Sequence, residues 1–169
     1  MTVKSAYVVD TNVAIVASGR SDHASPGCVI AAIDGLRRVR SGGKAVIDER
    51  NRILTEYFRR LSRSGQPGVG EAFVKWVSDN QGNPELCERV EIHPRSNPRG
   101  EDYVEFPDTQ ALAGFDHDDR KFVAVALASQ LSPSILNAVD SGWWDYRLPL
   151  RKHGVEIEFL CPGQFNGGD

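Results

Sequence analysis

The sequence predicts a single α/β domain in which a parallel sheet is covered by helices on both faces. Short apolar runs typical of buried strands alternate with amphipathic helical patterns along the 169 residues. Strands separated by helices favour parallel pairing, and the length is that of one ordinary domain. The sequence contains no repeat, low-complexity tract or domain boundary that would interrupt this alternation.

The positions of the expected elements follow from the spacing of apolar residues. Runs typical of short buried strands lie at residues 5–10, 44–48, 135–140 and 155–160. Ser25 and Pro26 form a typical helix start, and apolar residues then recur at helical spacing. Further helices are expected at about 53–61, 70–79 and 118–130, and in a tryptophan-bearing segment after residue 140.

Residues 82–114 lack this periodicity. Four prolines and scattered charges mark irregular chain there, with one short strand expected near 103–106. So long a weakly structured segment is uncommon inside a compact domain and is often functional. The sequence therefore predicts one domain over residues 1–169, with a loop-rich segment at about 82–114.

The composition excludes several classes of protein. With 20 basic and 23 acidic residues the net charge is -3, which argues against a protein that wraps duplex DNA. The chain is 40% hydrophobic and 25% charged, as globular proteins are, and no apolar run approaches the roughly 18–20 residues of a membrane span. The first apolar run is short and meets Asp10 at once, unlike a secretory signal peptide. We therefore expect a cytoplasmic protein with no membrane partner.

The three cysteines, Cys28, Cys87 and Cys161, lie far apart in the sequence. An odd count without a Cys-x-x-Cys pair argues against both a disulfide framework and a structural zinc site. The expectation is therefore a protein whose thiols are reduced.

Four acidic residues are candidates for one site. Asp10 and Asp140 end two of the predicted strands, and ligands of open parallel sheets bind beyond the carboxyl ends of the strands. Asp119 heads the apolar stripe of a later helix, which directs its side chain towards the sheet. The fourth acid flanks the apolar stripe of the helix after the second strand, where periodicity alone does not choose between Glu49 and Glu56. Each acid taken alone is more typical of a helix cap or a solvated surface.

Converging carboxylates indicate a particular chemistry. They repel one another unless a cation lies between them. Three or four carboxylates without histidine or cysteine form an oxygen-rich site that suits Mg²⁺ or Mn²⁺. An ion in such a site activates a water molecule and neutralises charge on a phosphodiester. The sequence therefore indicates metal-dependent phosphoryl chemistry.

Four segments of the chain resemble the motifs of PIN domains, a family of metal-dependent ribonucleases. Residues 8–12 (Val-Val-Asp-Thr-Asn) are similar to the opening strand of the family, and residues 53–57 to its glutamate-bearing helix. Residues 116–126 are similar to the third motif, and residues 135–140 to the strand that delivers the fourth acid. The resemblance extends over about residues 7–160 and is weakest in the loop-rich segment.

The resemblance also implies roles for individual residues, and it selects Glu56 rather than Glu49. The implied catalytic residues are Asp10, Glu56, Asp119 and Asp140, and the three aspartates among them are the implied metal ligands. Thr11 and Asn12 are implied to orient the site, and Asp116 is expected beside it. PIN domains often carry a further acid two residues after the fourth one. This chain has Gly142 at that position, so Asp145 is a candidate substitute.

From the same resemblance follow expectations about fold, cofactor and partners. It implies a three-layer α/β/α sandwich around a four- or five-stranded parallel sheet, with one or two Mg²⁺ or Mn²⁺ ions. It implies endonucleolytic cleavage of single-stranded or structured RNA. Many PIN domains are toxins of toxin–antitoxin pairs, commonly dimeric and held inactive by an antitoxin protein that reaches the acidic site, and others act alone.

Arginines and tryptophans suggest how RNA is held. Arg52, Arg59 and Arg60 lie on the polar side of the helix that carries Glu56 and are expected to contact backbone phosphates. Of the adjacent Trp143 and Trp144, one is expected in the core and one at a rim, where an unpaired base can stack. The tryptophans, the arginine-rich helix and the apolar face of the first long helix offer more surface than a small sheet covers. A symmetric homodimer is therefore expected.

Three other functions fit the sequence less well. A haloacid-dehalogenase-like phosphatase needs a second aspartate two residues after the first, where this chain has Asn12. A P-loop protein needs a lysine that residues 65–70 lack. The stronger alternative is a catalytically inactive PIN-like module that binds RNA or protein. The four clustered acids argue against it, because like charges without a metal are costly.

Overall fold

The computed structural model describes residues 4–165 and confirms the predicted α/β class. Within these residues, five strands form one all-parallel sheet in the order β3-β2-β1-β4-β5. The strands are β1 (Ser5–Val9), β2 (Gly43–Asp48), β3 (Cys87–Val90), β4 (Ser134–Asn137) and β5 (Glu156–Phe159). The sheet has five strands, the larger of the two numbers that the resemblance implied.

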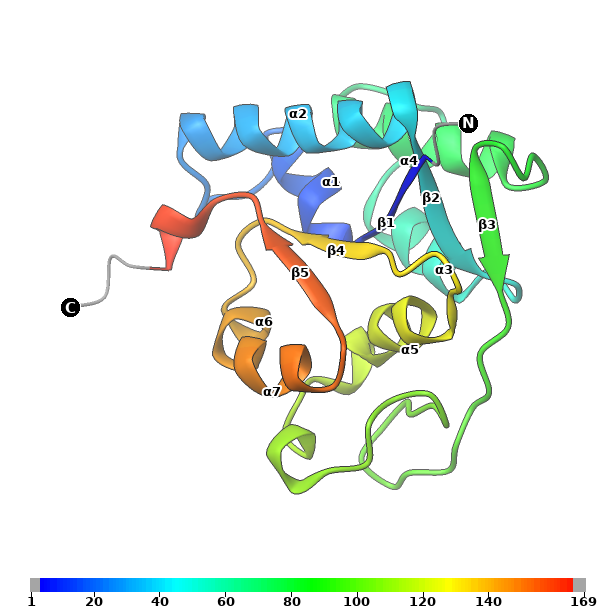
Figure 1. Cartoon of the computed structure of the whole chain (residues 1–169). Helices are drawn as coiled ribbons and strands as arrows, with labels where there is room; N and C mark the ends of the chain where they lie inside the picture. The colour runs from blue at the N-terminus through cyan, green and yellow to red at the C-terminus, as the bar shows by residue number, and fades with distance from the viewer. Residues whose placement is uncertain (1–3, 166–169) are drawn as a thin grey trace.

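Helices cover both faces of the sheet, which gives three layers (Figure 1). One face carries α1 (Thr11–Ala17), α2 (Pro26–Gly42) and α4 (Val69–Asn80), and the other carries α5 (Arg120–Ala128), α6 (Ser141–Asp145) and α7 (Arg147–Lys152). The helix α3 (Arg52–Arg60) follows β2 and contacts α1 and α4 as well as α5. Short 3-10 helices η1 (Gln110–Leu112), η2 (His117–Asp119) and η3 (Pro162–Gln164) complete the described chain. No helix in residues 4–165 is long and apolar enough to cross a membrane.

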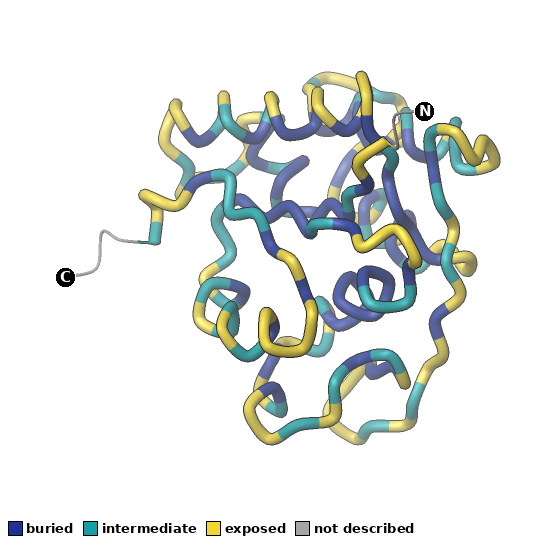
Figure 2. The backbone as a smooth tube through the Cα atoms, in the orientation of Figure 1, coloured by how far each residue is buried: buried dark blue, intermediate teal, exposed yellow. Residues whose placement is uncertain are grey.

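The core lies on both sides of the three central strands, where the backbone in Figure 2 is almost continuously buried. Val8, Val46 and Ile135 of these strands are fully buried, as are Phe122 and Val123 of α5. Burying an apolar side chain of this size stabilises the fold by about 1.5–3 kcal/mol. Packing of α5 against the sheet therefore fixes the start of this helix, which Asp119 directly precedes.

Helix α1 and strand β3 are among the elements that were not predicted. Helix α1 is short, and five of its seven residues are buried, so it lacks the polar face that an amphipathic pattern requires. Gly70 of α4 permits its close packing, because a Cβ atom there would lie 1.9 Å from the carbonyl oxygen of Ala14. Strand β3 lies inside the segment expected to be irregular, and the strand expected near 103–106 is wrong. Tyr103 there makes only an isolated bridge with Pro94.

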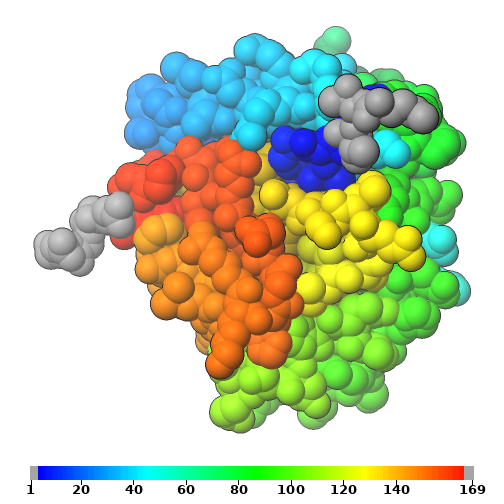
Figure 3. Space-filling view, in the orientation of Figure 1, coloured from blue at the N-terminus to red at the C-terminus, as the bar shows by residue number. Residues whose placement is uncertain are grey.

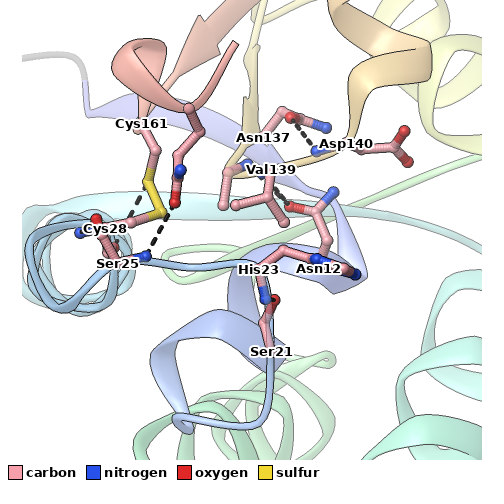
Figure 4. The surroundings of a disulfide bond; sticks show 11 residues. Asn12, Ser21, His23, Ser25, Cys28, Asn137, Val139, Asp140 and Cys161 are labelled. Carbon is pink, nitrogen blue, oxygen red and sulfur yellow. Dashed lines mark hydrogen bonds between the residues drawn. A yellow bond between two sulfur atoms is a disulfide. The ribbon is translucent and has the colours of Figure 1, made fainter. Parts of the chain in front are cut away.

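The expectation of reduced thiols is wrong for two of the three cysteines. Cys28 and Cys161 form a disulfide with an S–S distance of 2.05 Å, across 133 residues of sequence. They meet because the first turn of α2 lies beside the segment after β5 (Figures 3 and 4). Contact between two segments so far apart in sequence leaves no signal in cysteine spacing. Cys87 is free and buried.

Candidate metal centre

The carboxyl ends of β1 and β4 lie side by side at the point where the strand order of the sheet reverses. From β1 the chain crosses to β2 and then β3 on one side, and from β3 it returns to β4 and β5 on the other. Asp10 directly follows β1, and its N–H donates to the carbonyl oxygen of Leu136 in β4 at 3.1 Å. Asp140 follows β4. Ligand sites of open parallel sheets lie at such a switch point.

A cavity of about 430 Å³ opens at this point. Its wall contains Asp10, Asp119 and Asp140, each of which offers one carboxylate oxygen, and these oxygens all lie within 4.8 Å of one another. The predicted acid Glu56 lines the same cavity, whereas Glu49 is exposed and does not. The remaining lining residues are Thr11, Asn12, Ile15, Arg59, Arg60, Glu101, Asp116, Asp118, Lys121 and Val139. The structure therefore brings all four predicted acids together.

Hydrogen bonds to two asparagines fix the buried Asp10. Its Oδ2 accepts from Nδ2 of Asn12 at 2.8 Å and from Nδ2 of Asn137 at 3.2 Å. Oδ1 of Asn12 in turn accepts from the N–H of Ala138 at 2.8 Å, and Oδ1 of Asn137 accepts from the N–H of Asp140 at 3.3 Å. Figure 4 shows Asn12 beside Val139 and Asn137 beside Asp140. The two amides thus join β1 and β4 around the carboxylate. Asn137 was not among the residues predicted for the site.

The other aspartates differ in whether their carboxylate accepts a helix-capping hydrogen bond. Asp140 caps α6, with Oδ1 accepting from the N–H of Gly142 at 2.9 Å. Asp116 caps η2 by accepting from the N–H of Asp118 at 3.0 Å. Asp119 precedes α5 but accepts no capping hydrogen bond. Its carboxylate therefore keeps its capacity to bind a cation.

Asp48 shows the contrasting case of a strand-terminal acid outside the cavity. It ends β2 and is fully buried. Its two oxygens accept from the N–H groups of Arg50, Arg52 and Ile53 at 2.9–3.1 Å. Asp48 therefore accepts from the first N–H groups of α3, a capping role that is common for an acid at this position.

Burial and repulsion raise the pKa values of the clustered aspartates. Burial, with the negative charges of Asp140 and Glu56, raises the pKa of Asp10 from 3.8 to about 8. Burial, with the charges of Asp10 and Asp140, raises the pKa of Asp119 to about 9. Burial also raises the pKa of Asp140. The cluster therefore favours binding of positive charge, whether protons or a metal cation.

The cavity also contains a cation that the sequence reasoning missed. Lys121, in the first turn of α5, is only 5% exposed, and its Nζ lies 2.8 Å from Oε1 of Glu56. Oε2 of Glu56 accepts a hydrogen bond from Oγ1 of Thr11. The one available signal was the place of Lys121 two residues after Asp119, in a helix whose first turn is otherwise buried.

Two of the three predicted RNA-binding arginines line the cavity, namely Arg59 and Arg60. Arg52 does not, because its guanidinium group lies 5.7 Å from the centre of the Tyr103 ring at the other end of α3. Asp145, the candidate fifth acid, is not among the lining residues either.

The tryptophans divide as expected between core and periphery. Trp143 is fully buried. Trp144 stacks on Phe165 with ring centres 4.9 Å apart, and the guanidinium carbon of Arg147 lies 3.9 Å from its ring centre. Its ring is therefore already in contact with two side chains and does not offer a free platform for a base.

The donor set fits a small divalent cation. Asp10, Asp119 and Asp140 supply three converging carboxylate oxygens without nitrogen or sulfur, the ligands that Mg²⁺ and Mn²⁺ prefer. Searches against protein-family models, characterised proteins and solved structures found no match to this chain.

Proposed function

We propose that the protein is a Mg²⁺- or Mn²⁺-dependent endoribonuclease. The observation that carries the proposal is the convergence of the Asp10, Asp119 and Asp140 carboxylates within 4.8 Å at the switch point of the sheet. Carboxylates that merely cap helices have no reason to converge, and holding them together without a cation is costly.

Each part of the cavity has a role in phosphodiester hydrolysis. Asp10, Asp119 and Asp140 would hold the ion, which supplies an activated water and neutralises charge that builds up on the phosphate. Asn12 and Asn137 keep the Asp10 carboxylate in place through its Oδ2 atom. The cationic side chains of Arg59 and Arg60 at the wall are available to backbone phosphates.

The choice of RNA rests on the resemblance of the four motifs to PIN domains and on charge. A chain with a net charge of -3 lacks the overall positive charge of proteins that wrap duplex DNA. The same resemblance extends the proposal to a dimeric toxin held inactive by an antitoxin that reaches the acidic cavity.

The test is cleavage of labelled structured RNAs in Mn²⁺ or Mg²⁺, with EDTA as the metal-free reference. Asp119→Asn is expected to reduce the rate more than about 100-fold, since even residues that only support metal ligands cost about 10–100-fold. Glu49→Gln is the matched control and is expected to cleave like the wild type, because Glu49 is exposed and outside the cavity. Cleavage that persists in EDTA or in Asp119→Asn would place the activity elsewhere. A wild type that binds RNA and cleaves none would favour an inactive binding module.

A further inference from the structure

The four predicted acids in the cavity wall differ in the partners that surround their carboxylate groups. Asp10, Asp119 and Asp140 have oxygens that converge for one ion. Glu56 is outside this group of three, and both of its oxygens have partners within the protein, Thr11 at Oε2 and Lys121 at Oε1. The structure thus separates a three-carboxylate site from a glutamate that already has a cation beside it.

Lys121 is held firmly in this position. Its side chain is 5% exposed, and Nζ also donates to the backbone carbonyl of Asp118 and lies 3.8 Å from Oε2 of Glu101. The contacts come from α3, from the turn before α5 and from the loop that carries Glu101. An ammonium group placed by three separate segments is part of the cavity and does not move freely into solvent.

The position of the Lys121 ammonium limits where a second metal ion could bind. Its Nζ already lies 2.8 Å from Oε1 of Glu56, the one acid of the four predicted ones that is outside the three-carboxylate group. A second divalent ion beside Glu56 would have to displace the ammonium from Oε1, against its repulsion at close range. It would also have to compete with the partners that both Glu56 oxygens already have, Lys121 at Oε1 and Thr11 at Oε2.

We infer that the centre holds a single divalent cation and that the Lys121 ammonium occupies the place beside Glu56 that a second cation would take. This inference rests on the proposed function, because it assigns the charges of the same site. Lys121 is then a positioning residue for Glu56 and a fixed positive charge at the cavity wall. The substrate phosphate meets one metal ion and one ammonium group instead of two metal ions.

The test is the stoichiometry of Mn²⁺ binding, measured by calorimetry on the metal-free full-length protein. We expect one Mn²⁺ per chain for the wild type and for Lys121→Arg, which keeps the charge. Lys121→Met removes the charge and keeps much of the length, and it should bind a second Mn²⁺ more weakly. Lys75→Met is the control, because Lys75 is half-exposed on α4 and pairs with Asp79, and it should bind one.

Thermal melting in EDTA gives a second readout that does not depend on cleavage. Lys121→Met should melt at least about 6 °C lower than the wild type, because removing one partner of a buried ion pair is strongly destabilising. Added Mn²⁺ should recover most of the loss. If Lys121→Met fails to fold, the wild-type stoichiometry still decides the question.

The outcomes separate this inference from the proposed function. Two Mn²⁺ per wild-type chain would overturn the single-ion centre and leave a metal-dependent nuclease intact. One Mn²⁺ in Lys121→Met with wild-type affinity and melting temperature would overturn the role of Lys121. No Mn²⁺ binding to the wild type would overturn both.

Discussion

Without a metal ion, ionisation of the cavity aspartates is predicted to lower the free energy of unfolding of the protein as pH rises. Burial and the neighbouring negative charges raise the pKa of the Asp10 carboxyl to about 8 and that of the Asp119 carboxyl to about 9, against 3.8 for an ordinary aspartate. A raised pKa in the folded state means that the native protein binds these protons more tightly than the unfolded chain does. Stability from this source is therefore complete below about pH 4 and is lost as pH rises to 8–9.

The magnitude follows from the shift of Asp10. One pKa unit corresponds to about 1.4 kcal/mol, so a shift from 3.8 to about 8 sets an upper limit of about 6 kcal/mol for this residue alone. Part of the pKa shift of Asp10 comes from repulsion by Asp140 and Glu56. This repulsion is a shared free energy, so it is counted once for the cluster and not once for each residue. Water that enters the cavity lowers the cost further. We therefore expect a loss of about 2–4 kcal/mol between pH 5 and 9, or about 4–16 °C in melting temperature for a domain of this size.

The assay is thermal melting in EDTA at several pH values between 5 and 9. Asp10→Asn and Asp119→Asn should each melt at a higher temperature than the wild type at pH 8, because one crowded charge is removed, and their pH dependence should be weaker. Glu49→Gln should follow the wild type. Saturating Mn²⁺ should remove most of the loss at high pH, as a ligand of the native state does. A wild-type melting temperature that is flat or rises over this range, or Asn variants less stable than the wild type, would refute the reasoning.

Two further predictions concern RNA and association. Replacing Arg59 and Arg60 together by alanine should weaken RNA binding about tenfold or more in low salt and reduce the slope of log affinity against log salt. Arg52→Ala should leave that slope unchanged. Filter binding at three salt concentrations measures the affinity and the slope. Light scattering at tens of micromolar protein should give twice the chain mass of 18.6 kDa, since Ile30 is exposed and Val69, Phe73 and Trp76 line a groove between α2 and α4 whose wall also contains Arg37 and Arg40; a monomer mass would exclude the dimer.

The order of elements and the acids could be predicted because both depend on local pattern. A buried strand that ends in an acid is visible in sequence, and parallel topology then places Asp10 and Asp140 at the same edge. Tertiary contacts were not predictable in this way. Residues 52 and 59 are seven apart, so they share a helix face but lie about 10 Å apart along the axis. Arg52 lies against the ring of Tyr103, a contact with a distant segment that the helical pattern does not reveal.

The same limit explains Lys121 and Asn137. A lysine in an apolar helix is usually directed to solvent, and its burial here follows from the approach of α3 and the Glu101 loop. Side chains whose role depends on contact between distant segments are thus the ones that pattern alone does not identify.

The disulfide has a consequence for the connectivity of the centre. Strands β1 to β3 come from the N-terminal half of the chain, and β4 and β5 come from the C-terminal half. The boundary between the two halves, which we call the seam, therefore runs between β1 and β4 and through the acidic cavity. Asp10 and Glu56 belong to one half, and Asp119 and Asp140 to the other. A single backbone cut in the intervening loop would separate these pairs, but the Cys28–Cys161 bond would keep the halves in one covalent molecule. The four acids would then remain tethered across the seam, and the cut would be visible on a denaturing gel only after reduction.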